Sequence, residues 1–269
     1  MNHRPAASCA PRAITATITL CTSLTLAGAR PALAIMDEIQ VYTDDIDKPG
    51  EFGLELHINT TPSGRSVPDY PGEVTPWHGL RVTPEFSYGL THDLEAGLYL
   101  PFVRDASGTT YFAGSKVRLK WLPVRQENGG DGWFLGLNIE LSKVANRFEQ
   151  GDLQLELRPI IGGRTGGWLV AFNPVLDWAV GAPQPAAGPD FSPQWKIAYT
   201  VAPGVAIGPE YYAELGKVNG WLPPSDRLQT LYLTVDLERE RWGLNFGIGH
   251  GLNAATDAWT VKAIIGFTF

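Results

Sequence analysis

The chain has 269 residues, 21 of them basic and 28 acidic, and a formal net charge of −7. This acidic balance argues against nucleic-acid binding, because a protein that binds phosphates needs a basic face. After residue 34, no apolar run approaches the ~18 residues of a membrane helix, which excludes a helical membrane protein but leaves membrane strands of ~9–11 alternating residues open.

Residues 1–34 are predicted to be a cleaved signal peptide. Arg4 and Arg12 supply a basic start, and an apolar run of signal length extends from Ala13 to Ala27. Ala32-Leu33-Ala34 then offers a small-x-small cleavage site.

The mature chain, expected to begin at Ile35, contains no cysteine. Both cysteines, Cys9 and Cys21, lie in the signal, and Leu20 disfavours lipidation of Cys21 because a lipoprotein signal needs a small residue there. The lack of a thiol excludes a disulfide framework, thiolate metal sites and cysteine catalysis. Removing the signal takes away three arginines and no acid, which leaves 18 basic against 28 acidic residues and a net charge of −10.

An acidic segment, residues 35–50, is expected to precede the folded domain. The acidic residues of this region are Asp37, Glu38, Asp44, Asp45, Asp47 and Glu51. Their spacing lacks the glycine and the closing glutamate of a calcium loop, so no specific metal site is expected here. Two interpretations stay open: a solvated periplasmic tail, or a partial plug that folds into the mouth of a barrel.

Residues 51–269 are predicted to form strands throughout. The first strand alternates Phe52, Leu54, Leu56 and Ile58 with small or polar residues. The same period recurs, between turns rich in Gly, Pro, Asn and Asp, in Leu80–Leu90, Leu94–Phe102, Ala113–Trp121, Trp133–Leu141, Asp152–Ile161, Trp168–Val180, Phe191–Val201, Val205–Leu215, Leu228–Leu237, Trp242–Ile248 and Trp259–Phe269. Twelve strands in one domain of sandwich or barrel type are therefore expected.

The predicted connections alternate between long and short, which favours a membrane barrel over a soluble sandwich. The long ones are Thr61–Gly79, Val103–Phe112, Gly181–Asp190 and Lys217–Arg227, and the short ones are Thr91–Asp93, Arg164–Gly167, Ala202–Gly204 and Glu238–Arg241. Outer-membrane barrels have short periplasmic turns and long outside loops. Pro123–Gly132 is polar and spans ten residues where a tight turn is expected, so either this turn is extended or the predicted register is wrong there.

Aromatic residues are predicted to gather at strand ends, as the two interfaces of a bilayer favour. On the expected periplasmic side they are Trp121, Trp133, Trp168, Trp242, Phe267 and Phe269, and on the opposite side Trp178, Phe191, Trp195 and Trp259. The predicted fold class is therefore all-β: a single antiparallel up-and-down transmembrane β-barrel of about 12 strands, closed because an open edge in lipid would leave backbone groups unpaired.

The last strand carries a resemblance of its own. Trp259 to Phe269 alternates strictly and ends on an aromatic residue at the C-terminus. It resembles the final strand of Gram-negative outer-membrane β-barrels, whose assembly signal is a C-terminal Phe. The resemblance implies an outer-membrane location, contact with membrane lipid, and recognition of Phe269 by the barrel-assembly machinery. The alternative is the last strand of an exported sandwich.

The face of the strands expected to line a lumen is unusually charged. The candidate lumen and selectivity residues are Glu55, His57, Arg81, Glu85, Lys116, Arg118, Lys120, Glu140, Glu156, Arg158, Lys196, Glu210 and Lys262. Lys116, Arg118 and Lys120 form a basic ladder on one strand. A stripe of one sign can guide anions. The alternative is a set of lateral ion pairs with Glu95, Glu140 and Glu156 that holds the wall rigid or the lumen shut.

A catalytic or metal site is not predicted. His57 with Asn59 and Ser87 could be arranged as base, orienting group and nucleophile, and Glu55, His57 and Glu85 could form a metal site. Neither set has a recognisable motif, since there is no G-x-S-x-G and no His pair at ligand spacing. We therefore expect no enzymatic activity, no cofactor and no metal.

The start of the mature chain carries a second resemblance. Glu38-Ile39-Gln40-Val41-Tyr42, then Pro49-Gly50, then Leu54, His57 and Asn59, is similar to the start of a group of uncharacterised proteobacterial barrels. Members of that group are labelled as transporters or as proteins of a MetA pathway of phenol degradation. The resemblance implies an outer-membrane location and passage of small organic solutes.

The function expected is an outer-membrane channel or facilitator for passive diffusion of small polar or aromatic-acid solutes. Strand count alone cannot decide whether the lumen conducts, because ~8-stranded barrels are filled by side chains and ~16–18-stranded porins are open. Two alternatives are kept: a closed structural or adhesive barrel that exposes loops such as Thr61 to His78, and a lipid-modifying barrel enzyme. An apolar outer face with small gaps at Ala96 and Ala263 leaves association between barrels open.

Overall fold

The structure of the protein is a computed structural model that describes Met1 and residues 38–126, 129–151, 153–180 and 188–269. Apart from Met1, the signal peptide predicted over residues 1–34 lies outside the described residues, as do Ile35 and Asp37. All strands belong to one unit, Pro31–Phe269. No helix in the described ranges is long and apolar enough to span a membrane.

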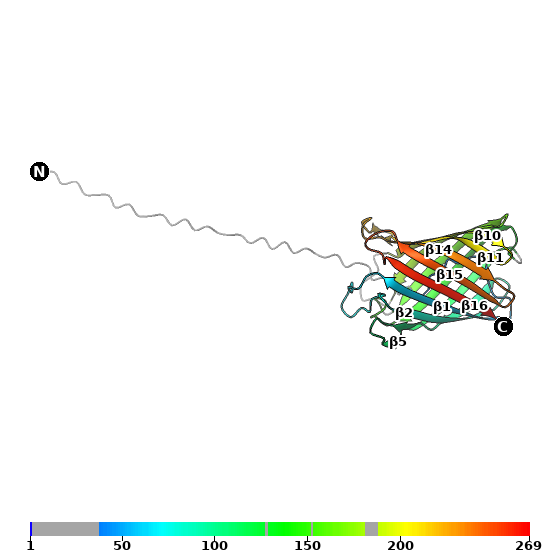
Figure 1. The fold of residues 1–269 in the computed structure, drawn as a ribbon, viewed down its shortest axis with the longest axis horizontal. Helices are drawn as coiled ribbons and strands as arrows, with labels where there is room; N and C mark the ends of the chain where they lie inside the picture. Colours follow the sequence, from blue (N-terminus) through cyan, green and yellow to red (C-terminus); the bar gives the residue numbers. More distant parts are fainter. Residues whose placement is uncertain (2–37, 127–128, 152, 181–187) are drawn as a thin grey trace. The chain divides into compact units, whose positions relative to one another are not determined.

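In the described part of the chain, sixteen strands form one sheet that closes on itself. They are β1 (Phe52–Ser63), β2 (Leu80–Gly89), β3 (Leu94–Tyr99), β4 (Phe102–Arg104), β5 (Thr110–Phe112), β6 (Gly114–Val124), β7 (Gly132–Val144), β8 (Gln154–Thr165), β9 (Trp168–Ala179), β10 (Asp190–Ala202), β11 (Val205–Glu214), β12 (Gly216–Lys217), β13 (Gly220–Trp221), β14 (Leu228–Glu238), β15 (Trp242–Gly251) and β16 (Trp259–Thr268). β1 pairs with both β2 and β16, and Figure 1 shows β1 and β16 side by side. The first strand thus meets the last.

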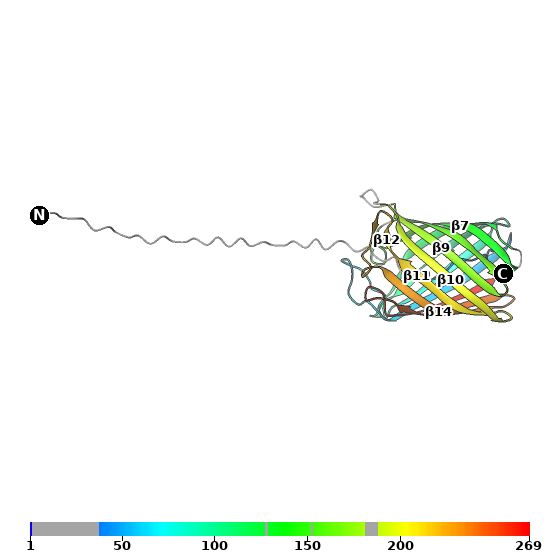
Figure 2. The ribbon, with the colours of Figure 1, turned by 90° about the horizontal axis from the view of Figure 1, so that it is seen from above.

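The predicted twelve-stranded antiparallel barrel is confirmed. Each predicted strand appears within a few residues of its expected bounds, and every neighbouring pair is antiparallel. β3 and β4 are two parts of one wall strand interrupted at Leu100 and Pro101, because β2 pairs with both of them. β5 and β6 are likewise two parts of the next wall strand, interrupted at Ala113, because β4 pairs with β5 and β3 pairs with β6. β12 and β13 form a small hairpin in the connection that leads from β11 to β14. Figure 2 shows β9, β10 and β11 running beside one another on a further part of the wall.

One of the tight connections is the two-residue turn between β8 and β9. Gly166 and Gly167 have φ angles of 55° and 86°. A two-residue hairpin turn whose two residues both have positive φ is the type that matches the twist of the strands, and glycine adopts it without strain. The short connections gather at this end of the barrel, which is called the short-turn end below; the other is the long-loop end.

The connection between β6 and β7 remains the exception at the short-turn end. Residues 125–131 join the two strands, while the pairing runs from Gly114↔Val144 to Trp121↔Leu137 and shifts before Val124. The predicted register is therefore correct over the main part of both strands, and the connection is longer than the tight turn expected there.

The two faces of the barrel differ in chemistry. Large apolar side chains on the outward face are exposed, among them Val117, Leu119, Ile139 and Leu233. The inward positions alternate with them and carry buried polar and charged groups such as Arg118. This is the inverse of a soluble barrel, because apolar exposure on the whole outer wall is favourable in lipid and unfavourable in water.

Candidate functional site: the barrel interior

All thirteen predicted lumen residues lie on the inward face of the wall. Nine of them are buried, namely His57, Arg81, Glu85, Arg118, Glu140, Arg158, Lys196, Glu210 and Lys262. Glu55 is partly exposed. Lys116, Lys120 and Glu156 complete the set, with side chains 12%, 12% and 15% exposed. Period-2 alternation alone brings them to one side, since each lies an even number of residues from its neighbour on the same strand.

The basic ladder on β6 is paired with carboxylates of neighbouring strands. Lys116 lies 3.3 Å from Glu140, and Lys120 lies 3.1 Å from Glu95. Arg118 lies 2.6 Å from Glu95. Glu156, expected as a further partner of the ladder, instead pairs with Arg158 of its own strand, whose Nε donates to Glu156 at 2.7 Å. The ladder is therefore a mixed charge network rather than a stripe of one sign.

Arg118 is the central residue of a buried chain of hydrogen bonds. Its guanidinium donates to Glu85 Oε1 at 2.7 Å and to the hydroxyl of Tyr99 at 2.8 Å. The hydroxyls of Tyr99 and Tyr42 are 2.7 Å apart. The chain thus connects the wall strands β2, β3 and β6 to Tyr42, which belongs to the segment that precedes β1.

A second charged cluster lies on the other side of the interior, on β10, β11, β14 and β16. Lys196 lies 3.1 Å from Glu210 and 2.8 Å from Asp236. Lys262 pairs with Glu210 and donates to the backbone oxygen of Ile39 at 2.8 Å. Like Arg118, this cluster joins the wall to the segment before β1.

Residues 38–50 therefore run inside the barrel, and polar contacts hold them along their length. Asp44 accepts three hydrogen bonds of 2.7 to 2.9 Å from Arg164. The backbone N–H of Tyr42 donates to Asn173 Oδ1 at 2.7 Å, and Asn173 Nδ2 donates to the oxygen of Tyr42 at 3.1 Å. The N–H of Asp47 donates to Glu95 at 2.6 Å. Residues 38–50 are called the inner segment below.

Apolar side chains of the wall also hold the inner segment. These apolar contacts were not predicted from the sequence. Ile39, Val41 and Tyr42 are buried in one cluster with inward residues from seven wall strands. Those wall residues are Leu122, Phe134, Ile160, Leu169, Ala171, Ala198, Tyr212 and Tyr232. The signal was present in the sequence, because Leu122 follows Lys120 at an even spacing and Ile160 follows Arg158 in the same way, so each continues the inward row of its strand.

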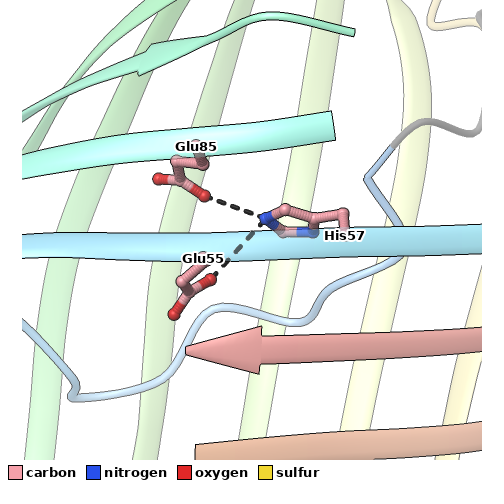
Figure 3. Close-up of side chains that lie close together, drawn as sticks. All are labelled: Glu55, His57 and Glu85. Carbon is pink, nitrogen blue, oxygen red and sulfur yellow. Dashed lines mark hydrogen bonds and ion pairs between the residues drawn. The ribbon is translucent and has the colours of Figure 1, made fainter. Parts of the chain in front are cut away.

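The inward faces of β1 and β2 bring Glu55, His57 and Glu85 together, as Figure 3 shows. His57 Nε2 lies 3.0 Å from Glu85 Oε2 and 3.6 Å from Glu55 Oε2. The register places Glu55 directly opposite Glu85. Ser87, considered above as a nucleophile beside His57, donates its hydroxyl proton to Asp47 instead, at 2.5 Å. His57 and Ser87 thus have separate partners.

Loop residues pack over part of the long-loop end. Phe148, from the connection between β7 and β8, is buried with Val103, Ala113 and Val144 of the wall. The N–H of Val74, from the connection between β1 and β2, donates to the oxygen of Arg147 at 2.8 Å. Two long loops are thus fixed against each other and against the rim.

Solved structures with the same fold are outer-membrane channels. A COG4313 outer-membrane channel from Pseudomonas putida F1 has a TM-score of 0.58 at 14% identity, over 86% of this chain and 100% of that chain. KdgM porin gives 0.53 at 10% identity, over 81% and 99% of the two chains, and NanC porin gives 0.50 at 8%, over 80% and 98%. No family model matches the chain, and no curated protein matches its sequence. The resemblance to MetA-pathway barrels therefore stays a prediction.

The fold is that of the porin-like β-barrel channels of the Gram-negative outer membrane. An apolar outer wall, a polar interior and an even number of antiparallel strands are the features that it shares with that class.

Proposed function

We propose that the protein is an outer-membrane channel for passive diffusion of small polar or aromatic-acid solutes, narrowed by its own inner segment. The observation that carries the proposal is the interior itself. Buried ionised side chains cost several kcal/mol each, and a wall that only had to fill itself would be more stable with apolar residues. A water-filled path gives a reason to keep them, since charged groups are favourable where they face water.

The inner segment supplies the narrowing. It lies between the two charged clusters, with Tyr42 near three cations of the wall: the guanidinium carbons of Arg118 and Arg158 lie 5.8 and 4.5 Å from the ring centroid, and Lys120 Nζ lies 5.3 Å from it. These contacts combine an aromatic face with positive charge, and both attract the same kind of ligand, an aromatic ring that bears a carboxylate. This supports the aromatic-acid class, as does the resemblance of residues 38–42 to MetA-pathway barrels.

The channel neighbours also favour a barrel without enzymatic activity. In the same proposal the short-turn end faces the periplasm, and Phe269, whose N–H donates to the backbone oxygen of Phe52 at 3.0 Å, is the residue that the assembly machinery recognises.

The second candidate is a closed structural barrel. The ion pairs of the basic ladder favour the closed barrel, because a carboxylate oxygen lies within 3.3 Å of the side-chain nitrogen of each of Lys116, Arg118 and Lys120.

One measurement separates the two candidates. The mature chain, Ile35 to Phe269, is refolded and inserted into a planar bilayer under a salt gradient. Discrete conductance steps support a channel, and the sign of the reversal potential identifies the preferred ion. A heat-modifiable, inserted barrel without steps supports the closed barrel. Deleting Ile35 to Asp47 is then expected to raise the conductance, and an unchanged conductance would contradict the role given to the inner segment.

A further inference from the structure

Although the sequence carries no metal-binding motif and predicted no metal, we propose from the geometry that Glu55, His57 and Glu85 bind a divalent transition-metal ion of the zinc type inside the barrel wall. The three side chains each offer one ligand atom, and these atoms all lie within 4.8 Å of one another (Figure 3). The two distances from His57 Nε2, 3.0 and 3.6 Å, are close to the ~3.3–3.5 Å that separates ligand atoms placed at ~2.0–2.2 Å around a tetrahedral zinc ion.

The orientation of the imidazole is the first argument. Nε2 of His57 faces oxygen atoms of two carboxylates, while Nδ1 has no hydrogen-bond partner among the described residues. A lone pair on Nε2 would repel both oxygens, so Nε2 has to carry either a proton or a metal ion. A proton on Nε2 can satisfy Glu85, whereas a metal ion satisfies Glu85 and Glu55 together.

The charge around the site is the second argument. Four carboxylates, those of Asp47, Glu55, Glu85 and Glu95, lie in this part of the interior, and the cations Arg118 and Lys120 pair with two of them, Glu85 and Glu95. With a neutral His57, the formal charges of this group leave two negative charges in excess. A divalent cation neutralises this excess, which is the arrangement that buried charges require.

The groups behind the ligands form the third argument. Metal-bound carboxylates are themselves hydrogen-bonded in built sites, which fixes their orientation. Arg118 donates to Oε1 of Glu85, so that Oε2 faces His57. Gln40 of the inner segment donates to Oε2 of Glu55 at 3.2 Å, the same oxygen that faces His57. Both carboxylates are therefore hydrogen-bonded, but only Glu85 has its partner on the oxygen directed away from His57.

The exposure of the three ligands indicates where an ion enters. The side chains of His57 and Glu85 are 0% and 2% exposed, whereas that of Glu55 is 38% exposed. Glu55 is an inward residue of β1, so its exposed part faces the interior. An ion reaches the site from the lumen, and the remaining coordination position stays open to water or solute on that side. One nitrogen with two oxygens suits zinc better than calcium, which takes six to eight oxygen ligands.

Metal binding is measured on the full barrel in detergent after treatment with a chelator. Cobalt is titrated and followed by its visible absorption, and zinc is titrated by calorimetry. One ion per chain is expected, with no competition from equimolar calcium. His57→Gln should weaken binding by about 100-fold or more, and Glu55→Gln by about 10- to 100-fold.

The variants keep the proposal falsifiable even if one of them misfolds. Glu55→Gln changes a partly exposed side chain to one of the same shape, and heat-modifiable migration reports whether each barrel is folded. His92→Gln, in the exposed connection between β2 and β3, is the matched control and should bind as the wild type does. Absence of binding by the folded wild type, or wild-type binding by both ligand variants, would overturn the proposal. None of these readouts depends on conductance. A negative result in the conductance measurement would therefore leave the metal-binding proposal unaffected.

Discussion

The guanidinium of Arg164, at the short-turn end of β8, donates three hydrogen bonds to the carboxylate of Asp44 in the inner segment, at 2.7, 2.9 and 2.9 Å. Two residues 120 positions apart in the sequence thus fix the inner segment to the wall. Hydrogen bonds between charged groups are the strongest that side chains make, and their strength increases where water is scarce.

Asp44→Asn should release the inner segment part of the time. The substitution removes the charge of the acceptor and costs about 1.5–3 kcal/mol per charged hydrogen bond lost. Since 1.4 kcal/mol is a factor of ten, the open fraction in single-channel records should rise about tenfold or more. Asp45→Asn is the control. It removes the same negative charge at the next position in the sequence, but the side chain of Asp45 is exposed. If neither variant changes the open fraction, the contact between Asp44 and Arg164 does not control the proposed channel.

Asn173→Ala should loosen the inner segment by another route. The amide of Asn173 both accepts from and donates to the backbone of Tyr42, and so acts in place of a neighbouring strand. Its loss leaves two backbone groups unpaired, at about 1–3 kcal/mol each. Hydrogen exchange of the Tyr42 amide, measured by mass spectrometry, should become about tenfold faster or more.

Asn138→Ala is the matched control for that experiment. Asn138 is equally buried on β7, but neither atom of its amide group has a hydrogen-bond partner among the described residues. Removing an unpaired buried amide is nearly neutral or stabilising. Exchange at Tyr42 should stay at the wild-type rate, and an acceleration as large as that of Asn173→Ala would mean that any cavity in the wall loosens the segment.

The barrel was predictable because apolar, lipid-facing residues alternate with polar, inward-facing residues along each membrane strand. Alternation identified all twelve wall strands and also placed Lys116, Arg118 and Lys120 on the inward side. The partners of these cations were only partly predictable, since Glu156 was expected near the ladder but pairs with Arg158. Which charges meet across a wall depends on strand stagger, and period-2 alternation carries no information about stagger.

The path of the inner segment was less predictable than the wall. Its acidic residues indicated either a tail or a plug, because charge alone fits both water and a basic partner. The deciding groups are Ile39 and Val41, which are buried against inward apolar residues of the wall. Inward apolar positions such as Leu122 and Ile160 interrupt the charged rows at one level of the barrel, and this interruption is the sequence signal for a docked segment.

Glu95→Gln should shift ion selectivity toward anions. Glu95 lies 2.6 Å from Arg118 and 3.1 Å from Lys120, and it is the carboxylate that these two cations share. Its neutralisation leaves the ladder with excess positive charge, which raises the local concentration of anions. The reversal potential under a salt gradient should move toward the value for the anion. Glu240→Gln, in the exposed turn between β14 and β15, loses the same charge outside the lumen and should leave the potential unchanged.

Acid should release the long connection between β1 and β2, because Glu73 fixes it only in its ionised form. Arg65 donates to the two oxygens of Glu73 at 2.8 and 2.7 Å, and the N–H of Asp69 donates at 2.5 Å. Burial alone would raise the pKa of Glu73, but these hydrogen bonds and the charge of Arg65 hold the pKa below its ordinary value.

The sign follows from that depressed pKa. Glu73 stabilises the folded loop fully at pH values above the ordinary glutamate pKa of about 4.3, and this contribution is lost as the pH falls through the lower pKa of the folded state. Hydrogen exchange over residues 64–79, corrected for the intrinsic rate at each pH, should therefore be slow at pH 7 and become faster below about pH 4. Glu73→Gln should exchange rapidly at pH 7 and lose most of the pH dependence. Slow exchange at both pH values in the wild type would show that the loop is held by other contacts, such as the one between Val74 and Arg147.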